Sequence, residues 1–265
     1  MQARQGEASN YWRRVRVEVF VDMSMWELII DGAIDGLSNM AIDAALLDEV
    51  VASSSPRTIV RFYGWSRPTV SLGRNQKIDK AVDVEYCAAN GIDVVHRPTG
   101  GRAVLHDDEL TYAVISNDSS YFGDTIYGNY RTVSEALCRG YKSLGVPAVL
   151  APDTKKVSGF DNGADLPCFM SPSRYELMVE GRKIVGSAQR RVRDTFLQHG
   201  SMPVTCNREA LARATRLEDP SFLEREMAGV GEFLAERPTV EQLTGAFIRA
   251  FQESFSVEFR TRNSD

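Results

Sequence analysis

One of the four cysteines lies where a nucleophile is expected. Cys168 follows a polar stretch, residues 151–167, that contains two glycines and two prolines and reads as a mobile loop. A thiol in such a loop is expected to be partly exposed, as reactive thiols are. Cys87 and Cys138 instead fall inside predicted helices, and Cys206 falls in a linker. An inert buried thiol is the commoner fate of a cysteine, but position makes Cys168 the best candidate.

A lysine and three small residues form the next candidate segment, E-G-R-K-I-V-G-S-A-Q. Lys183 directly follows a predicted hairpin turn, from which its side chain can reach back over the sheet. Near a thiol, its cation would favour the thiolate and could donate a hydrogen bond to a developing oxyanion. The small residues Gly186, Ser187 and Ala188 would let a ligand lie flat against the strand. The ordinary alternative is a solvated lysine on a hairpin.

A glycine-rich turn between two predicted strands, residues 96–107, reads H-R-P-T-G-G-R-A-V-L-H-D. Gly100 and Gly101 permit positive φ and close backbone approach, so their N–H groups could bind a carboxylate, a phosphate or an acyl carbonyl. Arg97 and Arg102 add donors of fixed geometry. A tight turn with two solvated arginines is an equally good interpretation.

The histidines are few and are spaced unlike metal ligands. His106 stands beside Asp107, which places an imidazole next to a carboxylate at a strand end. His199 precedes a glycine at the end of another strand and is either a second titratable group or a satisfied structural histidine. Neither these two nor His96 have metal-ligand spacing to another histidine, so the sequence predicts no metal site.

Composition bounds the class of protein. The chain has 265 residues, which favours one large domain or one domain with an appendage. Its net charge of −5 argues against a general nucleic-acid binder. No apolar run is long enough to span a bilayer, and the N-terminus lacks the apolar region of a secretory signal. Four cysteines without a C-x-x-C pair argue against a disulfide scaffold. We therefore expect a cytoplasmic protein without membrane or nucleic-acid partners.

Strands interleaved with helices must position these residues. Alternating or β-rich segments predict strands at residues 15–21, 26–30, 58–63, 92–97, 103–106, 110–116, 175–179, 183–189 and 196–201. Helix signals are a cap at Ser38, a helix from Asp79 to Asn90, a capping box at Thr132 and Glu135, a start at Asp219, and a second capping box at Thr239 and Gln242. This order predicts an α+β fold with a largely antiparallel or mixed sheet. We divide the chain into an N-terminal arm and first strand (1–24), a catalytic domain (25–205) and a helical C-terminal extension (206–265).

Four motifs taken in order resemble the biotin/lipoate protein ligase superfamily, and within it the octanoyltransferase branch of the LipM type. They are R-P-T-G-G-R-A-V-L-H-D, C-F-x-x-P-S-x-Y-E, E-G-R-K-I-V-G-S-A-Q and L-Q-H-G-S, and the resemblance runs from about Trp26 to the C-terminus. The segment N-M-A-I-D at residues 39–43 also resembles the N-terminal helix of that family. The resemblance implies a class II aminoacyl-tRNA synthetase/biotin ligase-like catalytic domain, with a central mixed, mainly antiparallel sheet flanked by helices.

The same resemblance implies an acyltransferase of lipoate biosynthesis that acts without a cofactor. Octanoate would pass from octanoyl-acyl carrier protein to Cys168 as a thioester, and then to a lysine of the glycine-cleavage H protein or another lipoyl domain. The lysine of the family falls on Lys183, and its glycine loop on Gly100, Gly101 and Arg102. The loop departs from the family at one position, because His96 stands where an arginine is common. Arginines near the proposed site would form a basic rim for acidic carriers: Arg182, Arg190, Arg191 and Arg193.

Three other functions fit parts of this pattern. An ATP-dependent lipoate–protein ligase, with ATP and Mg²⁺ as cofactors, has the same loop and lysine but needs no thiol at Cys168. An amidotransferase that moves octanoate from octanoyl-H protein to other lipoyl domains also uses a cysteine. A non-catalytic module that binds carriers needs only the basic rim, and biotin ligase is a more distant relative that the thiol disfavours.

Overall fold

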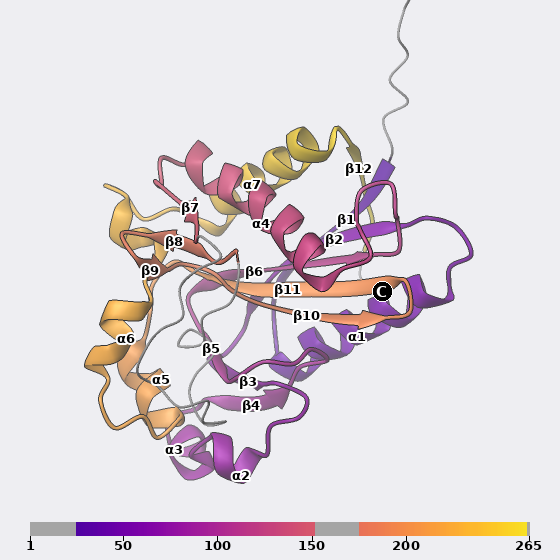
Figure 1. Cartoon of the computed structure of the whole chain (residues 1–265). Coiled ribbons are helices and arrows are strands. Elements are labelled where there is room, and N and C mark those ends of the chain that lie inside the picture. Colours follow the sequence, from indigo (N-terminus) through magenta and orange to yellow (C-terminus); the bar gives the residue numbers. More distant parts are fainter. Residues whose placement is uncertain (1–24, 152–174, 264–265) are drawn as a thin grey trace, which may run out of the picture.

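A six-stranded sheet forms the centre of the computed structural model, which describes residues 25–151 and 175–263 (Figure 1). Its strands, in spatial order, are β10 Gly186–Val192, β11 Thr195–Pro203, β6 Glu109–Ser116, β2 Thr58–Trp65, β1 Met25–Ile34 and β12 Glu258–Thr261. β1 runs parallel to both of its neighbours, and the other pairs are antiparallel. The predicted mixed, mainly antiparallel sheet is confirmed.

Two small sheets carry the segments that the sequence singles out. One consists of β4 Asp93–His96, β3 Thr69–Leu72 and β5 Val104–His106, and the glycine-rich turn connects β4 to β5. The other consists of β7 Val149–Leu150, β8 Leu177–Val179 and β9 Arg182–Lys183. The predicted turn between β8 and β9 is confirmed, with φ of 49° at Glu180 and 81° at Gly181.

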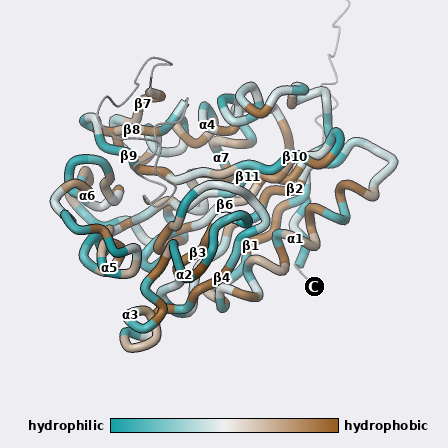
Figure 2. Tube along the Cα trace, turned by 60° about the horizontal axis from the view of Figure 1, so that its bottom comes forward, coloured by the Kyte–Doolittle hydropathy of each residue, from teal (hydrophilic) through white to brown (hydrophobic). Residues whose placement is uncertain are grey.

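Helices cover both faces of the central sheet. α1 Gly36–Ala52 packs on one face, and α4 Ile126–Ser143 and α7 Val240–Phe255 pack on the other (Figure 1). Strand β2 shows why: Ile59 and Tyr63 lie in the core under α1, whereas Val60 and Phe62 lie in the core under α4 and α7. Hydrophobic and hydrophilic residues are mixed along α1 (Figure 2), because its buried face includes the polar residues Asn39 and Asp43. No helix among the described residues is long and apolar enough to cross a membrane.

Short helices complete the molecule. They are α2 Ile78–Ala81, α3 Val84–Ala89, α5 Arg208–Ala214, α6 Ser221–Glu226 and the 3₁₀ helix Val230–Phe233. The single helix predicted from Asp79 to Asn90 is therefore wrong. The chain is extended at Val82, and the side chain of Asp83 accepts a hydrogen bond from the Tyr86 N–H and begins α3.

Two other predicted helix starts are also wrong. Asp35, rather than Ser38, caps α1, because its carboxylate accepts hydrogen bonds from both the backbone N–H and the hydroxyl of Ser38. α4 begins at Ile126 under a Thr125 cap, so Thr132 lies inside the helix, where its hydroxyl donates to the Gly128 carbonyl. A threonine three residues before a glutamate occurs on helix surfaces as well as at helix starts, so the motif alone does not identify where a helix begins. The capping box at Thr239 and Gln242 is confirmed.

The segment after residue 205 shares the core of the rest of the chain. α7 packs against α4, and β12 pairs with β1 at the edge of the central sheet, so the segment is not wholly helical. Arg262 donates hydrogen bonds to Glu27 and Glu49 at 2.9 Å each. The proposed division at residue 205 stays a prediction, and the expected arm and strand within residues 1–24 lie outside the described residues.

Candidate active site

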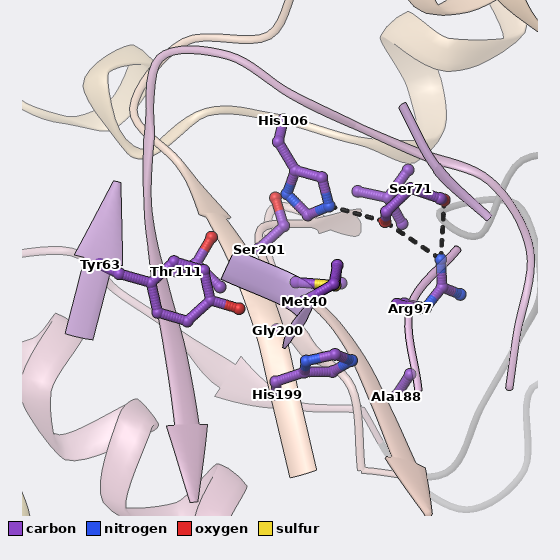
Figure 3. A pocket seen from close by; sticks show the side chains of 12 residues that line it. Met40, Tyr63, Ser71, Arg97, His106, Thr111, Ala188, His199, Gly200 and Ser201 are labelled. Atoms are coloured by element: carbon purple, nitrogen blue, oxygen red, sulfur yellow. Dashed lines mark hydrogen bonds between the residues drawn. The ribbon is translucent and has the colours of Figure 1, made fainter. Parts of the chain in front are cut away.

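A small cavity of about 20 Å³ lies between the small sheet of β3, β4 and β5 and the central sheet (Figure 3). Such a volume has room for about one water molecule. Met40 and Val104 supply apolar wall. Residues predicted to bind substrate line it from four segments of the chain: Arg97, His106, Gly186, Ala188 and His199. The topology therefore brings together residues that stand up to about a hundred positions apart in sequence.

The glycine-rich turn is built on a close backbone approach. A Cβ at Gly73 would stand 2.0 Å from the carbonyl oxygen of Gly101, so only glycine fits at position 73. Gly101 itself has a φ of +94°, and the space beside Gly100 is open. The two predicted glycines thus form an accessible turn, and Gly73, which sequence reasoning missed, is the residue that lets the turn approach β3.

Arg97 holds this turn from inside. Its side chain is buried, and its guanidinium donates to the carbonyl oxygens of Ser71 at 2.8 Å, Gly100 at 2.8 Å and Arg102 at 2.7 Å. The interpretation of Arg97 as a solvated arginine is therefore wrong. Arg102 is half-buried, and within the described part of the chain its side chain has no ion-pair or hydrogen-bond partner, so it remains available to a ligand.

We expect Gly73→Ala to misplace the turn with only a local effect on the fold. The added methyl group must displace the Gly101 carbonyl by more than 1 Å to reach ordinary contact. Because misplacement of about 1 Å costs roughly 10²-fold in rate, acyl-transfer activity should fall by about that factor. The measurement is turnover beside a thermal melt. Gly32→Ala is the matched control, since nothing lies within 4 Å of a Cβ there. Unchanged turnover in Gly73→Ala would show that the turn does not act in the reaction.

His106 belongs to a buried polar chain. Its Nε2 lies 2.8 Å from Ser71 Oγ (Figure 3), and its Nδ1 lies 2.8 Å from Glu109 Oε1. The ring also stacks on Trp65, with centroids 4.0 Å apart. The carboxylate predicted to pair with this imidazole was that of Asp107, which is wrong. Residue 107 follows the end of β5, whereas Glu109 begins β6 and turns inward beneath the histidine.

His199 belongs to a second buried chain that reaches the glycine-rich turn. Its Nδ1 lies 2.7 Å from Asp43 Oδ2, and its Nε2 lies 2.7 Å from the Thr99 hydroxyl. Asp43 is completely buried and also accepts from Arg61 at 2.7 Å and from the Tyr63 hydroxyl at 2.9 Å. Both ring nitrogens of His199 therefore have hydrogen-bond partners, as in a structural histidine. Asp43 fixes the orientation of the ring, and the ring holds the Thr99 hydroxyl in place.

Burial and the neighbouring charges explain the protonation states of these buried residues around His199. Burial lowers the pKa of His199 and outweighs the opposing effect of Asp43, so the imidazole is neutral and donates from Nδ1. Burial by itself raises the pKa of Asp43, but its hydrogen bonds and the permanent cation of Arg61 lower it, and we take the net direction to be downward. Desolvation raises the pKa of Tyr63 well above its usual range, so that hydroxyl remains a donor.

Lys183 is a buried cation. Its Nζ lies 2.5 Å from Glu176 Oε1, and its side chain is only 3% exposed. The alternative of a solvated lysine is therefore wrong. The backbone of the C-terminal segment holds this lysine in place, because the Ala228 N–H donates to the Lys183 carbonyl at 3.0 Å.

The small residues of β10 face a narrow part of the site. The Ser187 hydroxyl lies 2.8 Å from the Tyr112 hydroxyl, and burial raises the pKa of Tyr112. A Cβ at Gly200, opposite on β11, would stand 2.7 Å from Ser187 Oγ. Glycine at position 200 therefore lets β11 pack closely against the side chains of Ser187 and Tyr112.

Three of the four thiols are poor nucleophiles. Cys87 and Cys138 lie in α3 and α4, as predicted, and burial raises the pKa of each. Burial raises the pKa of Cys206 to about 12. None of these thiols is ionised to a useful extent near neutral pH. Cys168 lies outside the described residues, as does the loop before it. Among the residues that the structure describes, no cluster of potential metal ligands occurs.

The predicted basic rim is partly neutralised. Arg182 pairs with Glu232 at 2.6 Å, and Arg191 with Asp124 at 3.5 Å. Arg190 donates to a backbone carbonyl and has no acidic partner among the described residues.

Buried polar residues are what sequence reasoning missed. Asp43, Ser71 and Glu109 lie in elements rich in apolar residues, Glu176 directly precedes β8, and all four are less than a tenth exposed. A charged residue inside an otherwise apolar strand or helix face is the signal that could have found them, since such residues are buried only when paired.

Comparison with known proteins places this arrangement in one family. The lipoyl protein ligase A/B catalytic domain matches residues 35–252. The octanoyltransferase LipM of Geobacillus kaustophilus is 37% identical over 243 residues, covering 88% of this chain and 87% of its own. That of Bacillus subtilis is 36% identical over 243 residues, covering 88% of this chain and 87% of its own.

Solved structures agree on the fold. A lipoate-protein ligase A bound with ATP superposes with a TM-score of 0.70 and 28% identity, covering 90% of this chain and 89% of its own. A bi-partite lipoate protein ligase from Thermoplasma acidophilum gives a TM-score of 0.72 at 24% identity, covering 91% of this chain and 87% of its own.

Proposed function

Because this chain belongs to the family of the lipoyl protein ligase A/B catalytic domain, we propose that it transfers octanoate through a Cys168 thioester to a lysine of a lipoyl domain. It is an octanoyltransferase of lipoate biosynthesis. The observation that carries this conclusion is identity of 35–42% to octanoyltransferases LipM over most of the chain.

The first step of the proposed reaction makes an acyl-enzyme. The Cys168 thiolate attacks the carbonyl carbon of the octanoyl thioester on acyl carrier protein, and the carrier thiolate leaves with the proton that the cysteine released. The support for Cys168 is that the other three thiols have raised pKa values. Backbone N–H groups of Gly100 and Gly101 and the ammonium of Lys183 are the donors we assign to the oxyanion.

The second step makes an amide. The deprotonated amine of the acceptor lysine attacks the octanoyl thioester. The C–S bond breaks as the amide C–N bond forms, and the proton that the nitrogen loses returns to the Cys168 thiolate. Thioester exchange is nearly isoenergetic and amide formation from a thioester is downhill, so neither step requires ATP. The surface that Met40 and Val104 present beside the small cavity is where we assign the acyl chain. Each buried CH₂ contributes about 0.8 kcal/mol, so chain length is selected there.

The partners we propose are carrier proteins. Octanoyl-acyl carrier protein is the donor, and the glycine-cleavage H protein or another lipoyl domain is the acceptor. Arg102 and Arg190 have no acidic partner among the described residues and are the cations that we assign to the docking of acidic carriers. Octanoyl-H protein as the donor is the alternative that a donor assay separates.

An ATP-dependent lipoate–protein ligase is the second candidate. It is favoured by the similarity to a lipoate-protein ligase A that was solved with ATP. In that reaction the acyl group is first activated as an adenylate, so a thiol at position 168 is not needed.

Intact mass of the protein after incubation with octanoyl-acyl carrier protein separates these functions. Without ATP, we expect one octanoyl adduct that hydroxylamine removes and that Cys168→Ser prevents. Cys206→Ser is the matched control and should keep the adduct, because burial raises the pKa of that thiol to about 12. A protein that forms no adduct, and that octanoylates a lipoyl domain only with ATP and equally well as Cys168→Ser, would overturn the transferase proposal.

A further inference from the structure

An exposed segment with three cations follows β3, at the same end of the molecule as the glycine-rich turn (Figure 1). It spans residues 73–80, and Arg74, Lys77 and Lys80 are all exposed there. Asp79 is the one acidic residue of the segment. The whole chain carries a net charge of −5. The segment is therefore positive on a protein that is negative as a whole.

The cations of this segment are available to a partner. Within the part of the chain that the structure describes, none of Arg74, Lys77 and Lys80 has a carboxylate partner. Arg216, which lies beside the segment, instead pairs with Asp83 at 3.9 Å. Unneutralised charges of one sign attract a partner of the opposite sign and set the orientation in which it docks.

Hydrogen bonds hold the start of the segment in one position. The Gly73 N–H donates to Gln76 Oε1 at 3.0 Å, and the Gln76 N–H donates back to the Gly73 carbonyl at 2.8 Å. His96 Nε2 lies 3.0 Å from the Gln76 carbonyl, which only accepts, so the imidazole donates to it. The histidine that departs from the family loop therefore fixes this segment, and a surface that is already ordered binds at a lower entropic cost.

The segment also touches the turn that the proposed mechanism uses. The Arg74 N–H donates to the Thr99 carbonyl at 3.0 Å, and Gly73 makes the close approach to Gly101. Lys77 is four residues beyond Gly73, so the two Cα atoms are at most about 14 Å apart. The cations therefore begin at the edge of the turn and continue away from it along the surface.

An exposed apolar side chain lies among these cations. Ile78 directly follows Lys77 and is 41% exposed. Interfaces between proteins combine apolar contact with a polar or charged rim. We name these four residues the basic loop surface: Arg74, Lys77, Ile78 and Lys80.

We propose that the donor carrier protein docks on the basic loop surface. This inference rests on the proposed function, in which an acidic acyl carrier protein brings the octanoyl thioester. Acidic side chains of the carrier would meet Lys77 and Lys80, and its apolar side chains would meet Ile78. The phosphate of its phosphopantetheine arm is an anion that a guanidinium binds well, and Arg74 lies at the edge of the turn, along the path of that arm.

Reach favours the donor over the acceptor at this surface. Octanoate arrives at the end of the phosphopantetheine arm, which is much longer than an amino-acid side chain. A carrier on the basic loop surface can therefore extend its thioester to Gly100 and Gly101. The acceptor amine ends a single lysine side chain, so the lipoyl domain must lie directly over the reacting carbonyl.

The test reverses two charges of this surface in the full chain. In Lys77→Glu with Lys80→Glu, we expect the KM for octanoyl-acyl carrier protein to rise by about tenfold or more, with kcat little changed. The rate with octanoyl-pantetheine, which has neither the carrier nor its phosphate, should be unchanged. Added salt should raise the KM of the parent more steeply than that of the variant. Both side chains are exposed, so the fold should be retained.

A double substitution on another surface is the matched control. Arg139→Glu with Lys142→Glu changes the net charge by the same amount on α4, where both side chains are exposed and have no carboxylate partner among the residues described. It should keep the KM of the parent, because α4 lies on the face of the central sheet opposite α1 and away from the turn (Figure 1).

A binding measurement decides the question independently of turnover. Fluorescence anisotropy of a labelled acyl carrier protein that bears no acyl group gives the Kd for the parent and for both double variants. We expect weaker binding only in Lys77→Glu with Lys80→Glu. Absence of transfer from octanoyl-pantetheine in the parent would contradict the proposed function, while the Kd values would still test the docking surface.

Three results would overturn the docking proposal. The loop variant could keep the KM and Kd of the parent, or the α4 variant could weaken carrier binding as much as the loop variant does. The third is a loop variant that raises the KM for the lipoyl domain, with octanoyl-pantetheine as donor, since the surface would then belong to the acceptor.

Discussion

Lys183→Met is expected to abolish most acyl transfer and to destabilise the protein at the same time. The activity should fall by at least about 10²-fold, the typical effect of removing one oxyanion donor. The free energy of unfolding should fall by about 3–5 kcal/mol, because removal of one partner leaves a buried charge uncompensated. Glu176 lies 2.5 Å from the lysine, and its side chain is only 8% exposed.

A second substitution separates the two effects. Glu176→Gln added to Lys183→Met removes the stranded charge, so most of the lost stability should return while activity does not. Arg182→Met is the matched control, since that cation is the neighbouring residue in β9 but pairs with Glu232 nearer the surface. Exposed pairs contribute at most about 1 kcal/mol. Chemical denaturation and turnover are measured on the same preparations. If Lys183→Met kept full activity, the lysine would have only a structural role.

Arg61→Met should be the most destabilising single change among the buried polar residues that surround Asp43 and His199. Arg61 is completely buried and donates to Asp43 at 2.7 Å and to Asp31 at 2.6 Å. Without it, Asp43 keeps no permanent cation within hydrogen-bond distance among the described residues. We expect a loss of about 3–5 kcal/mol near pH 7, measured by urea denaturation.

The dependence of this loss on pH has a definite sign. In the parent protein the pKa values of Asp43 and His199 are both lowered, so both groups stabilise the fold above their unfolded pKa values and lose that contribution as pH falls. In Arg61→Met the native state takes up a proton more readily, on either of these groups. The deficit relative to the parent should therefore shrink between pH 7 and pH 5.

Arg57→Met provides the comparison for this pH series. Arg57 is the same type of residue and also pairs with carboxylates, but its side chain is 25% exposed. Its substitution should cost much less. A deficit in Arg61→Met that grows as pH falls would mean that Asp43 is not the group left uncompensated.

Local chemistry explains which elements could be predicted. The strand at residues 58–63 is rich in β-branched and aromatic residues, and the turn at residues 180–181 contains a glycine, so both form where the sequence predicts them. Thr239 and Gln242 cap α7 for the same reason, because each satisfies a backbone group within one helical turn. The same kind of motif at Thr132 failed, since six earlier residues already form the first turns of α4.

By itself, the sequence determined the α+β class, the family motifs in their order, and the choice of Cys168, Lys183 and the glycine pair as the residues of interest. Only the tertiary structure decided which side chains form hydrogen bonds and ion pairs with one another. It turned Arg97 inward, replaced Asp107 by Glu109 beside His106, and buried Lys183 against Glu176. The physical reason is that a motif is set by neighbours along the chain, whereas a buried polar group must be satisfied by whatever the packing brings within about 3 Å of it.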